Sequence, residues 1–201
     1  RALSIREKVL GDNHVLTATA LNNLGQLYKR EGLLSKAIPL YKKALTIYEQ
    51  TIGPNEPETA AAMNNLALAL QLIGSEEQAE DLLIRALFIT ENAKGPDHSD
   101  TALALNNLAM LYTKIGSHDK AGPLYKRAFT IAKKYLPPKH PDLATYLTNL
   151  ALNQKRQGLY SQSSELLERA LIIDKENLGV NHPDTSTTFN NLASSYISQK
   201  M

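Results

Sequence analysis

The 201-residue chain contains no cysteine and no tryptophan, and neither sign of charge predominates in it. Without cysteine there is no disulfide framework, no thiolate nucleophile and no cysteine-ligated zinc or iron–sulfur site. The 22 Lys and Arg against 20 Asp and Glu give no overall charge that would favour a nucleic acid or a membrane as partner. There is also no run of about 20 apolar residues, and charges near the start of the sequence argue against a secretory signal. We therefore expect a soluble, cytoplasmic protein.

What the sequence does contain is an internal repeat. The motif Asn-Asn-Leu recurs every 42 residues, at 22–24, 64–66, 106–108 and 190–192, and appears at 148–150 as Thr-Asn-Leu. A fixed period of this length indicates stacked supersecondary units that share one core. We therefore expect a single repeat domain over residues 1–201. It would comprise a partial repeat at 1–11, full repeats at 12–53, 54–95, 96–137 and 138–179, and a partial repeat at 180–201. Uncapped ends would leave it open to self-association.

Each full repeat is predicted to be a hairpin of two helices. In the second copy, Met63, Leu66 and Leu70 follow the spacing of an amphipathic helix, predicted over 57–72. Gly74 suits a left-handed C-cap after this helix. Ser75, with Gln78 three residues later, has the form of a capping box that begins a second helix running towards residue 95. The predicted fold class is thus an all-α stack of antiparallel helix hairpins.

This pattern resembles a known repeat family. The residues Leu24, Gly25, Tyr28, Gly32, Ala37, Tyr41 and Ala44 fall in the signature order of the tetratricopeptide repeat. The strings "ALSIREKVLG", "LNNLA" and "PLYKRAF" resemble the 42-residue repeats of kinesin light chains and related scaffold proteins. The resemblance implies a right-handed α-solenoid whose first helices line a concave groove. It also implies a cargo adaptor that binds acidic peptides carrying a bulky apolar anchor.

The first asparagine of each motif is the first candidate for the peptide site. Counting along the first helices places one amide per repeat towards the groove, at Asn22, Asn64, Asn106 and Asn190, with Thr148 in the fourth copy. Amides in a row can bind the backbone of an extended peptide. They can also bridge neighbouring helices instead, and this alternative stays open. The second asparagine is present in all five copies, and this uniformity favours an architectural role, with the amide satisfied by an adjacent turn.

Further along the same stripe, the predicted groove has an apolar middle and basic flanks. Its apolar candidates are Leu68, Leu72 and Met110, and its basic candidates are Lys29, Arg30, Lys114, Lys155 and Arg156. Such a surface would receive one large side chain and pair with acidic residues beside it. A solvated charged face with scattered apolar residues is the alternative for each residue taken singly.

Charge is also unevenly distributed along the chain. Residues 76–100 carry a net charge of −5, and residues 113–156 carry +7. Much of this charge falls on the second helices and the joints, where it would serve solubility or a second docking surface; we favour solubility. The second candidate function is accordingly a structural or regulatory arm of a larger signalling protein, binding through its ends or its convex face.

Catalysis and nucleic-acid binding find no support in the sequence. His14, His98, His140 and His182 occupy one column of the joints, a repeat apart, which is too far for a shared metal. Their predicted role is at the start of the first helices. No phosphate-binding glycine loop or HExxH motif occurs, and the groove stripe offers no aromatic residue on which a base could stack. We expect no enzyme activity, no cofactor, no metal and no nucleic-acid partner.

Overall fold

The computed structural model describes residues 2–200, and this part of the chain contains ten helices and no strand. It forms two compact units, the first ending at Pro96 and the second beginning at Asp97. The helices of the first unit are α1 (Ala2–Leu10), α2 (Val15–Arg30), α3 (Leu34–Thr51), α4 (Pro57–Leu72) and α5 (Glu76–Lys94). Those of the second are α6 (Ser99–Lys114), α7 (His118–Tyr135), α8 (Pro141–Arg156), α9 (Tyr160–Leu178) and α10 (Pro183–Gln199). The unit boundary falls at the joint between the predicted second and third repeats.

Helix α4 shows how the repeat sequence determines these boundaries. It begins at Pro57, where a missing N–H is harmless, and it ends before Gly74, whose φ of +78° lies in the left-handed region. This glycine lets the Ser75 N–H bond back to the Leu70 carbonyl at 3.0 Å, so the chain reverses within a few residues. The predicted span of 57–72 and the glycine C-cap are both confirmed.

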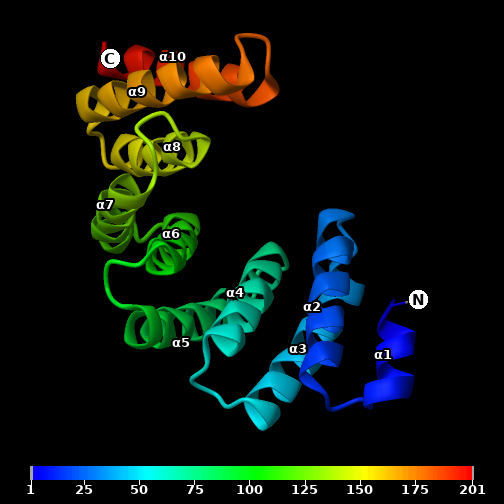
Figure 1. Ribbon diagram of the computed structural model, residues 1–201. Coiled ribbons are helices and arrows are strands. Elements are labelled where there is room, and N and C mark those ends of the chain that lie inside the picture. Colours follow the sequence, from blue (N-terminus) through cyan, green and yellow to red (C-terminus); the bar gives the residue numbers. More distant parts are fainter. Residues whose placement is uncertain (1, 201) are drawn as a thin grey trace. The chain divides into compact units, whose positions relative to one another are not determined.

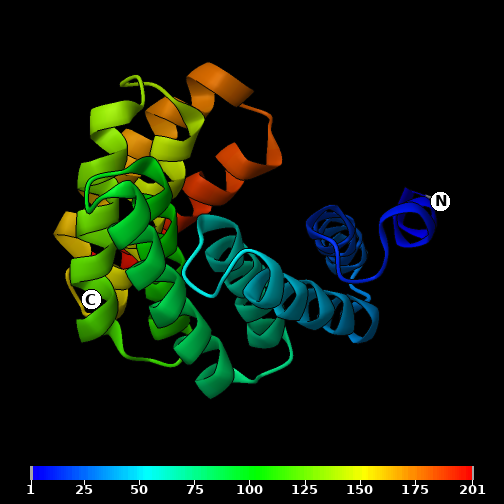
Figure 2. The same cartoon turned by 60° about the horizontal axis from the view of Figure 1, so that its bottom comes forward.

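Consecutive helices pack as antiparallel hairpins. In the first unit α2 packs on α3 and α4 on α5, and in the second α6 packs on α7 and α8 on α9 (Figures 1 and 2). Gly25 of α2 is buried against the Tyr41 ring of α3, and a Cβ atom at position 25 would lie 2.8 Å from Tyr41 Cε1. The small residue at this position is what lets the aromatic ring of the second helix sit between the two axes.

The hairpins are joined by a shared apolar core within each unit. Within each unit a second helix also packs on the next first helix, as α3 does on α4 and α7 on α8. Of the five core positions that the 42-residue alignment matches, Leu21, Met63, Leu105 and Leu147 are buried as predicted, whereas Phe189 is 56% exposed, so the prediction is wrong at that position. Burying one such side chain contributes roughly 1.5–3 kcal/mol. The fold therefore depends on contacts between repeats as well as on contacts within them.

The capping box predicted at Ser75 is wrong. Ser75 is the N-cap of α5, but its side chain makes no capping hydrogen bond, and its ψ is 64°. An N-cap side chain reaches the helix N–H groups from an extended backbone, and the tight reversal at Gly74 prevents that conformation. The first helices begin differently, through the histidine column described below.

Candidate functional site

The paired asparagines connect one first helix to the next. Asn65 Nδ2 of α4 donates to Asn22 Oδ1 of α2 at 3.1 Å, and Asn149 Nδ2 of α8 donates to Asn106 Oδ1 of α6 at 3.1 Å. In both units the second asparagine of one repeat therefore bonds to the first asparagine of the preceding repeat. These bonds run between helices that already pack against each other, α2 with α4 and α6 with α8.

This geometry bears on both asparagine predictions. Asn65 and Asn149 have the architectural role expected of the second asparagine, but both are half-buried, and their partner is an amide of the preceding repeat and not an adjacent turn. The first asparagine has its oxygen engaged by the stack at Asn22 and Asn106. Asn106 is buried and its Nδ2 lies 3.5 Å from Met110 Sδ. Asn64 is half-buried and Asn190 is exposed, so the amides differ in how much of each a ligand would reach.

The fourth repeat departs from the amide pairing at Thr148. A threonine has no amide oxygen to offer, and here α8 and α10 are linked instead by Lys155 Nζ, which donates to Ser194 Oγ at 2.5 Å. Lys155 is half-buried in this position. Lys155, predicted to bind the peptide, therefore also links two first helices.

The other predicted basic residues lie near the C-terminal ends of the first helices. Arg30, Lys114 and Arg156 are exposed in the last turns of α2, α6 and α8. Lys29 is half-buried, and its burial lowers the pKa of its ammonium group from the ordinary value. Cations in this part of a helix also interact favourably with the partial negative charge of its C-terminus.

The predicted apolar residues are accessible to different degrees. Leu72 is 64% exposed and Met110 is 41% exposed, whereas Leu68 is half-buried. Leu68 and Leu72 follow Asn64 at steps of four residues along α4, so the three side chains share one face of the helix. Met110 and Lys114 follow Asn106 in the same way along α6. The predicted stripe therefore exists on each of these helices, in separate units.

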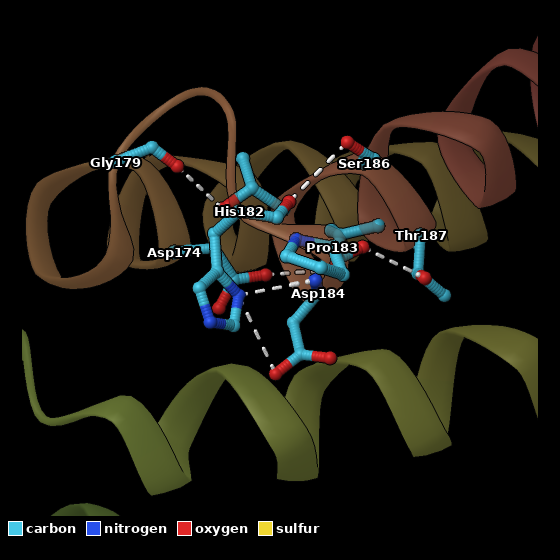
Figure 3. Close-up of polar contacts among 9 residues, drawn as sticks. Asp174, Gly179, His182, Pro183, Asp184, Ser186 and Thr187 are labelled. Atoms are coloured by element: carbon cyan, nitrogen blue, oxygen red, sulfur yellow. Dashed lines mark hydrogen bonds and ion pairs between the residues drawn. The ribbon is translucent and has the colours of Figure 1, made fainter.

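The histidine column begins the first helices. His182 is the N-cap of α10, and its Nδ1 accepts a hydrogen bond from the Asp184 N–H at 3.2 Å (Figure 3). His14, His98 and His140 make the equivalent bond at α2, α6 and α8. Their predicted role at the helix start is confirmed. In the second repeat the position is Glu56, whose side chain makes no capping bond.

Other kinds of site receive little support from the described residues. Within residues 2–200 no three His, Asp or Glu side chains are grouped as a metal site would require. None of the helices described combines the length and the apolar composition needed to cross a bilayer.

A hollow of about 370 Å³ in the second unit was missed by the sequence analysis. It lies among α7, α8, α9 and the joint before α8. Its lining consists of Phe129, Lys133, Pro138, Lys139, Leu143, Leu147, Arg169, Ile172 and Ile173. The sequence feature that would have revealed it is a set of exceptions in the repeat alignment, because several of these residues differ from their counterparts in the other repeats.

The comparisons with known proteins agree with this arrangement. The tetratricopeptide repeat pattern matches the chain in overlapping segments at residues 1–50, 30–92, 58–134, 100–176 and 142–201. Among solved structures, the chain is similar to the nearly identical TPR-like repeats of a Podosopora anserina protein described as a kinesin light chain. The TM-score is 0.80, at 24% identity over 93% of this chain and 89% of that one. BtubC (BKLC) from P. vanneervenii is also similar, with a TM-score of 0.81 and 23% identity over 99% of this chain and 79% of that one. A search of curated proteins gave no match.

Helix hairpins of fixed period, joined through their first helices, define a helical-repeat scaffold of the all-α, right-handed solenoid class, as predicted. The chain belongs to the tetratricopeptide repeat family. Members of this class are in general protein-interaction scaffolds without enzyme activity, and they bind protein partners.

Proposed function

We propose that this chain binds an extended, acidic peptide of a partner protein along its first helices, as an adaptor of the kinesin light chain type. The peptide would place one large apolar side chain against Leu68, Leu72 or Met110. Its carboxylates would pair with the basic residues at the ends of the first helices α2, α6 and α8.

The observation that carries the proposal is the exposed Leu72 at the end of α4, a helix that packs against α2, whose last turn is basic. Leu72 lies on α4 with 64% of its surface exposed, at the end of the stripe that begins with Asn64. Helix α2, which packs against α4, ends in Lys29 and Arg30. An exposed leucine at the end of one helix, together with cations at the end of the helix packed against it, favours a ligand that is both apolar and acidic.

The second unit supports the proposal with the same combination. Met110 is exposed on α6 and Lys114 follows it by one turn, while Arg156 is exposed at the end of α8. Methionine adapts its flexible side chain to varied partners. The amides contribute unequally in this proposal, because Asn22 and Asn106 already accept bonds from the neighbouring repeat.

The proposal is tested with fluorescein-labelled acidic peptides that carry an internal tryptophan or, as a matched set, alanine at that position. Fluorescence anisotropy is measured with the native chain, Arg30→Glu and Lys114→Glu at low and moderate salt. We expect the tryptophan peptides to bind better, binding to weaken with salt, and each variant to weaken binding by about tenfold.

Lys42→Glu is the control, because Lys42 is an exposed lysine of α3, a second helix. It changes the net charge by the same amount as the test variants and should leave binding unchanged. Equal losses in all three variants would show a general charge effect. Binding that is indifferent to Arg30, Lys114 and the tryptophan would refute the peptide site on the first helices.

A further inference from the structure

We propose that the hollow of about 370 Å³ formed by α7, α8 and α9 captures the C-terminal residue of a partner protein, with its carboxylate between Lys133 and Arg169 and its apolar side chain inside. The two cations of this site lie on the second helices α7 and α9, and the site does not depend on the peptide site proposed above.

The first argument is a broken pattern of ion pairs. At two other joints a basic residue pairs with a glutamate one repeat earlier. Lys43 Nζ of α3 lies 3.6 Å from Glu7 Oε1 of α1, and Arg85 Nη2 of α5 lies 3.3 Å from Glu49 Oε1 of α3. The counterpart of these pairs in the second unit is Arg169 with Lys133.

Lysine at 133 therefore replaces the carboxylate that the repeat pattern would supply. Lys133 and Arg169 are both exposed and both line the hollow. In the described part of the chain neither has a carboxylate partner, and the recorded contact of the Arg169 guanidinium is with the Phe129 ring, 5.5 Å from its centroid. Two cations without a counter-charge favour an anion from outside.

The second argument is the apolar lining, which is specific to this joint. Phe129 stands where the other copies have leucine, and Leu143 stands where they have threonine. The threonines Thr17, Thr59 and Thr185 each donate to a glycine carbonyl of the joint, at 2.7–2.9 Å. At the joint before α8, Pro137 occupies the position of this glycine and Leu143 that of the threonine. The threonine–glycine bond is therefore absent, and Leu143 contributes apolar surface to the hollow.

The third cation of the hollow is already neutralised. Lys139 Nζ lies 2.9 Å from Glu176 Oε1, and the Lys139 carbonyl accepts from Asn177 Nδ2 at 2.8 Å. These contacts hold the joint against α9, so they build one wall of the hollow. The charge that remains for a ligand therefore comes from Lys133 and Arg169.

A C-terminal residue fits this combination better than an internal acidic residue does. Successive side chains of an extended peptide point to opposite sides, so an internal Asp next to Leu would turn its carboxylate away from the hollow. A C-terminal residue carries its carboxylate and its apolar side chain on the same Cα atom. Both would then enter a hollow whose cations and apolar side chains line the same space.

A larger hollow of about 910 Å³ is also lined by Phe129 and would hold the rest of the peptide. Asn153 lines it, is fully buried, donates through Nδ2 to the His118 carbonyl at 3.2 Å, and has no partner for its Oδ1 among the described residues. An unpaired buried acceptor suits a peptide N–H. Gly122 makes room for this side chain, because a Cβ there would lie 3.2 Å from Asn153 Nδ2.

The experiment uses N-terminally fluorescein-labelled hexapeptides with mixed Gly, Ala, Ser and Thr positions and Leu, Phe or Ala as the last residue. Each is made with a free C-terminal carboxylate and with a C-terminal amide, and anisotropy is measured against the full chain. We expect the Leu or Phe acids to bind, with the matching amides and the Ala acids at least about tenfold weaker.

Lys133→Glu should reduce this binding by at least about tenfold, because it restores the ion pair found at two other joints. It should fold normally for the same reason, which thermal unfolding checks. Phe129→Leu, the residue of the other copies, should reduce binding several-fold. Lys42→Glu, and Arg30→Glu on the first helices, should leave it unchanged. The proposal is wrong if acid and amide bind alike, if Lys133→Glu binds as the native chain does, or if no peptide binds at millimolar protein.

Discussion

Tyr41 offers a sharp test of the packing described above, through the substitution Tyr41→Phe. Its side chain is fully buried against α2, and its hydroxyl has no hydrogen-bond partner among the described residues. A buried hydroxyl without a partner costs roughly 1–3 kcal/mol. Removing the oxygen while keeping the ring should therefore raise the free energy of unfolding by about 1 kcal/mol, or the melting temperature by about 2–4 °C for a chain of this size.

Tyr125 is the matched control, because it occupies the same repeat position two copies later. Its hydroxyl accepts a hydrogen bond from Thr113 Oγ1 at 3.3 Å. Tyr125→Phe removes that bond and should lower the free energy of unfolding by about 0.5–1.5 kcal/mol. Urea unfolding followed by far-UV circular dichroism measures both variants. The opposite sign of the two effects distinguishes the hydroxyl from the ring.

The alkaline range provides a second readout for Tyr41. Burial raises the pKa of its phenol from 10.0 to about 12. The folded chain then keeps a proton that the unfolded chain releases, so this contribution to stability is full below pH 10 and is lost as the pH rises towards 12. Tyr41→Phe should lose less stability over this range than the native chain. A destabilised Tyr41→Phe variant with an unchanged alkaline slope would refute the assignment of an unpaired buried phenol.

Three further substitutions and one control variant, Glu56→Ala, test the helix ends and the close approach of helices, each by urea unfolding. His182→Ala removes the side-chain cap of α10 and should cost about 1 kcal/mol, whereas Glu56→Ala, at a cap without such a bond, should cost less; equal effects would contradict the capping role. Gly25→Ala should destabilise, because the new Cβ would lie 2.8 Å from the buried Tyr41 ring; a stabilised variant would show that the ring can move. Gly74→Val should destabilise by more than 1 kcal/mol or so, because a β-branched residue is strained at a φ of +78°; an unchanged midpoint would rule out strain there.

Local structure was largely predictable because the repeat aligns equivalent residues. Gly74 could be identified as a C-cap, and the boundaries of α4 follow from Pro57 and this glycine. The histidine column could be placed at helix starts because it recurs in the joints. The capping box at Ser75 failed, since a short motif does not show that the preceding turn sets ψ to 64°.

The contacts between repeats were harder to predict. The bond from Asn65 to Asn22 joins residues 43 apart in the sequence, and it depends on how α4 lies beside α2. The hollow beside Phe129 was missed because its lining comes from two second helices, a first helix and a joint. Comparing each column for exceptions, and not only for agreement, would have singled out Lys133 and Leu143.

The amide bond between repeats also has a direction, since Asn65 donates to Asn22 and Asn149 donates to Asn106. A repeat therefore presents a donor to the repeat before it and an acceptor to the repeat after it. Tandem duplication can lengthen such a stack without creating a new kind of interface. Because the two ends of such a stack differ in this way, the bond cannot form in a two-fold dimer, and chains that join through it would meet head to tail. Head-to-tail contacts extend an assembly unless the rotation between chains closes it into a ring.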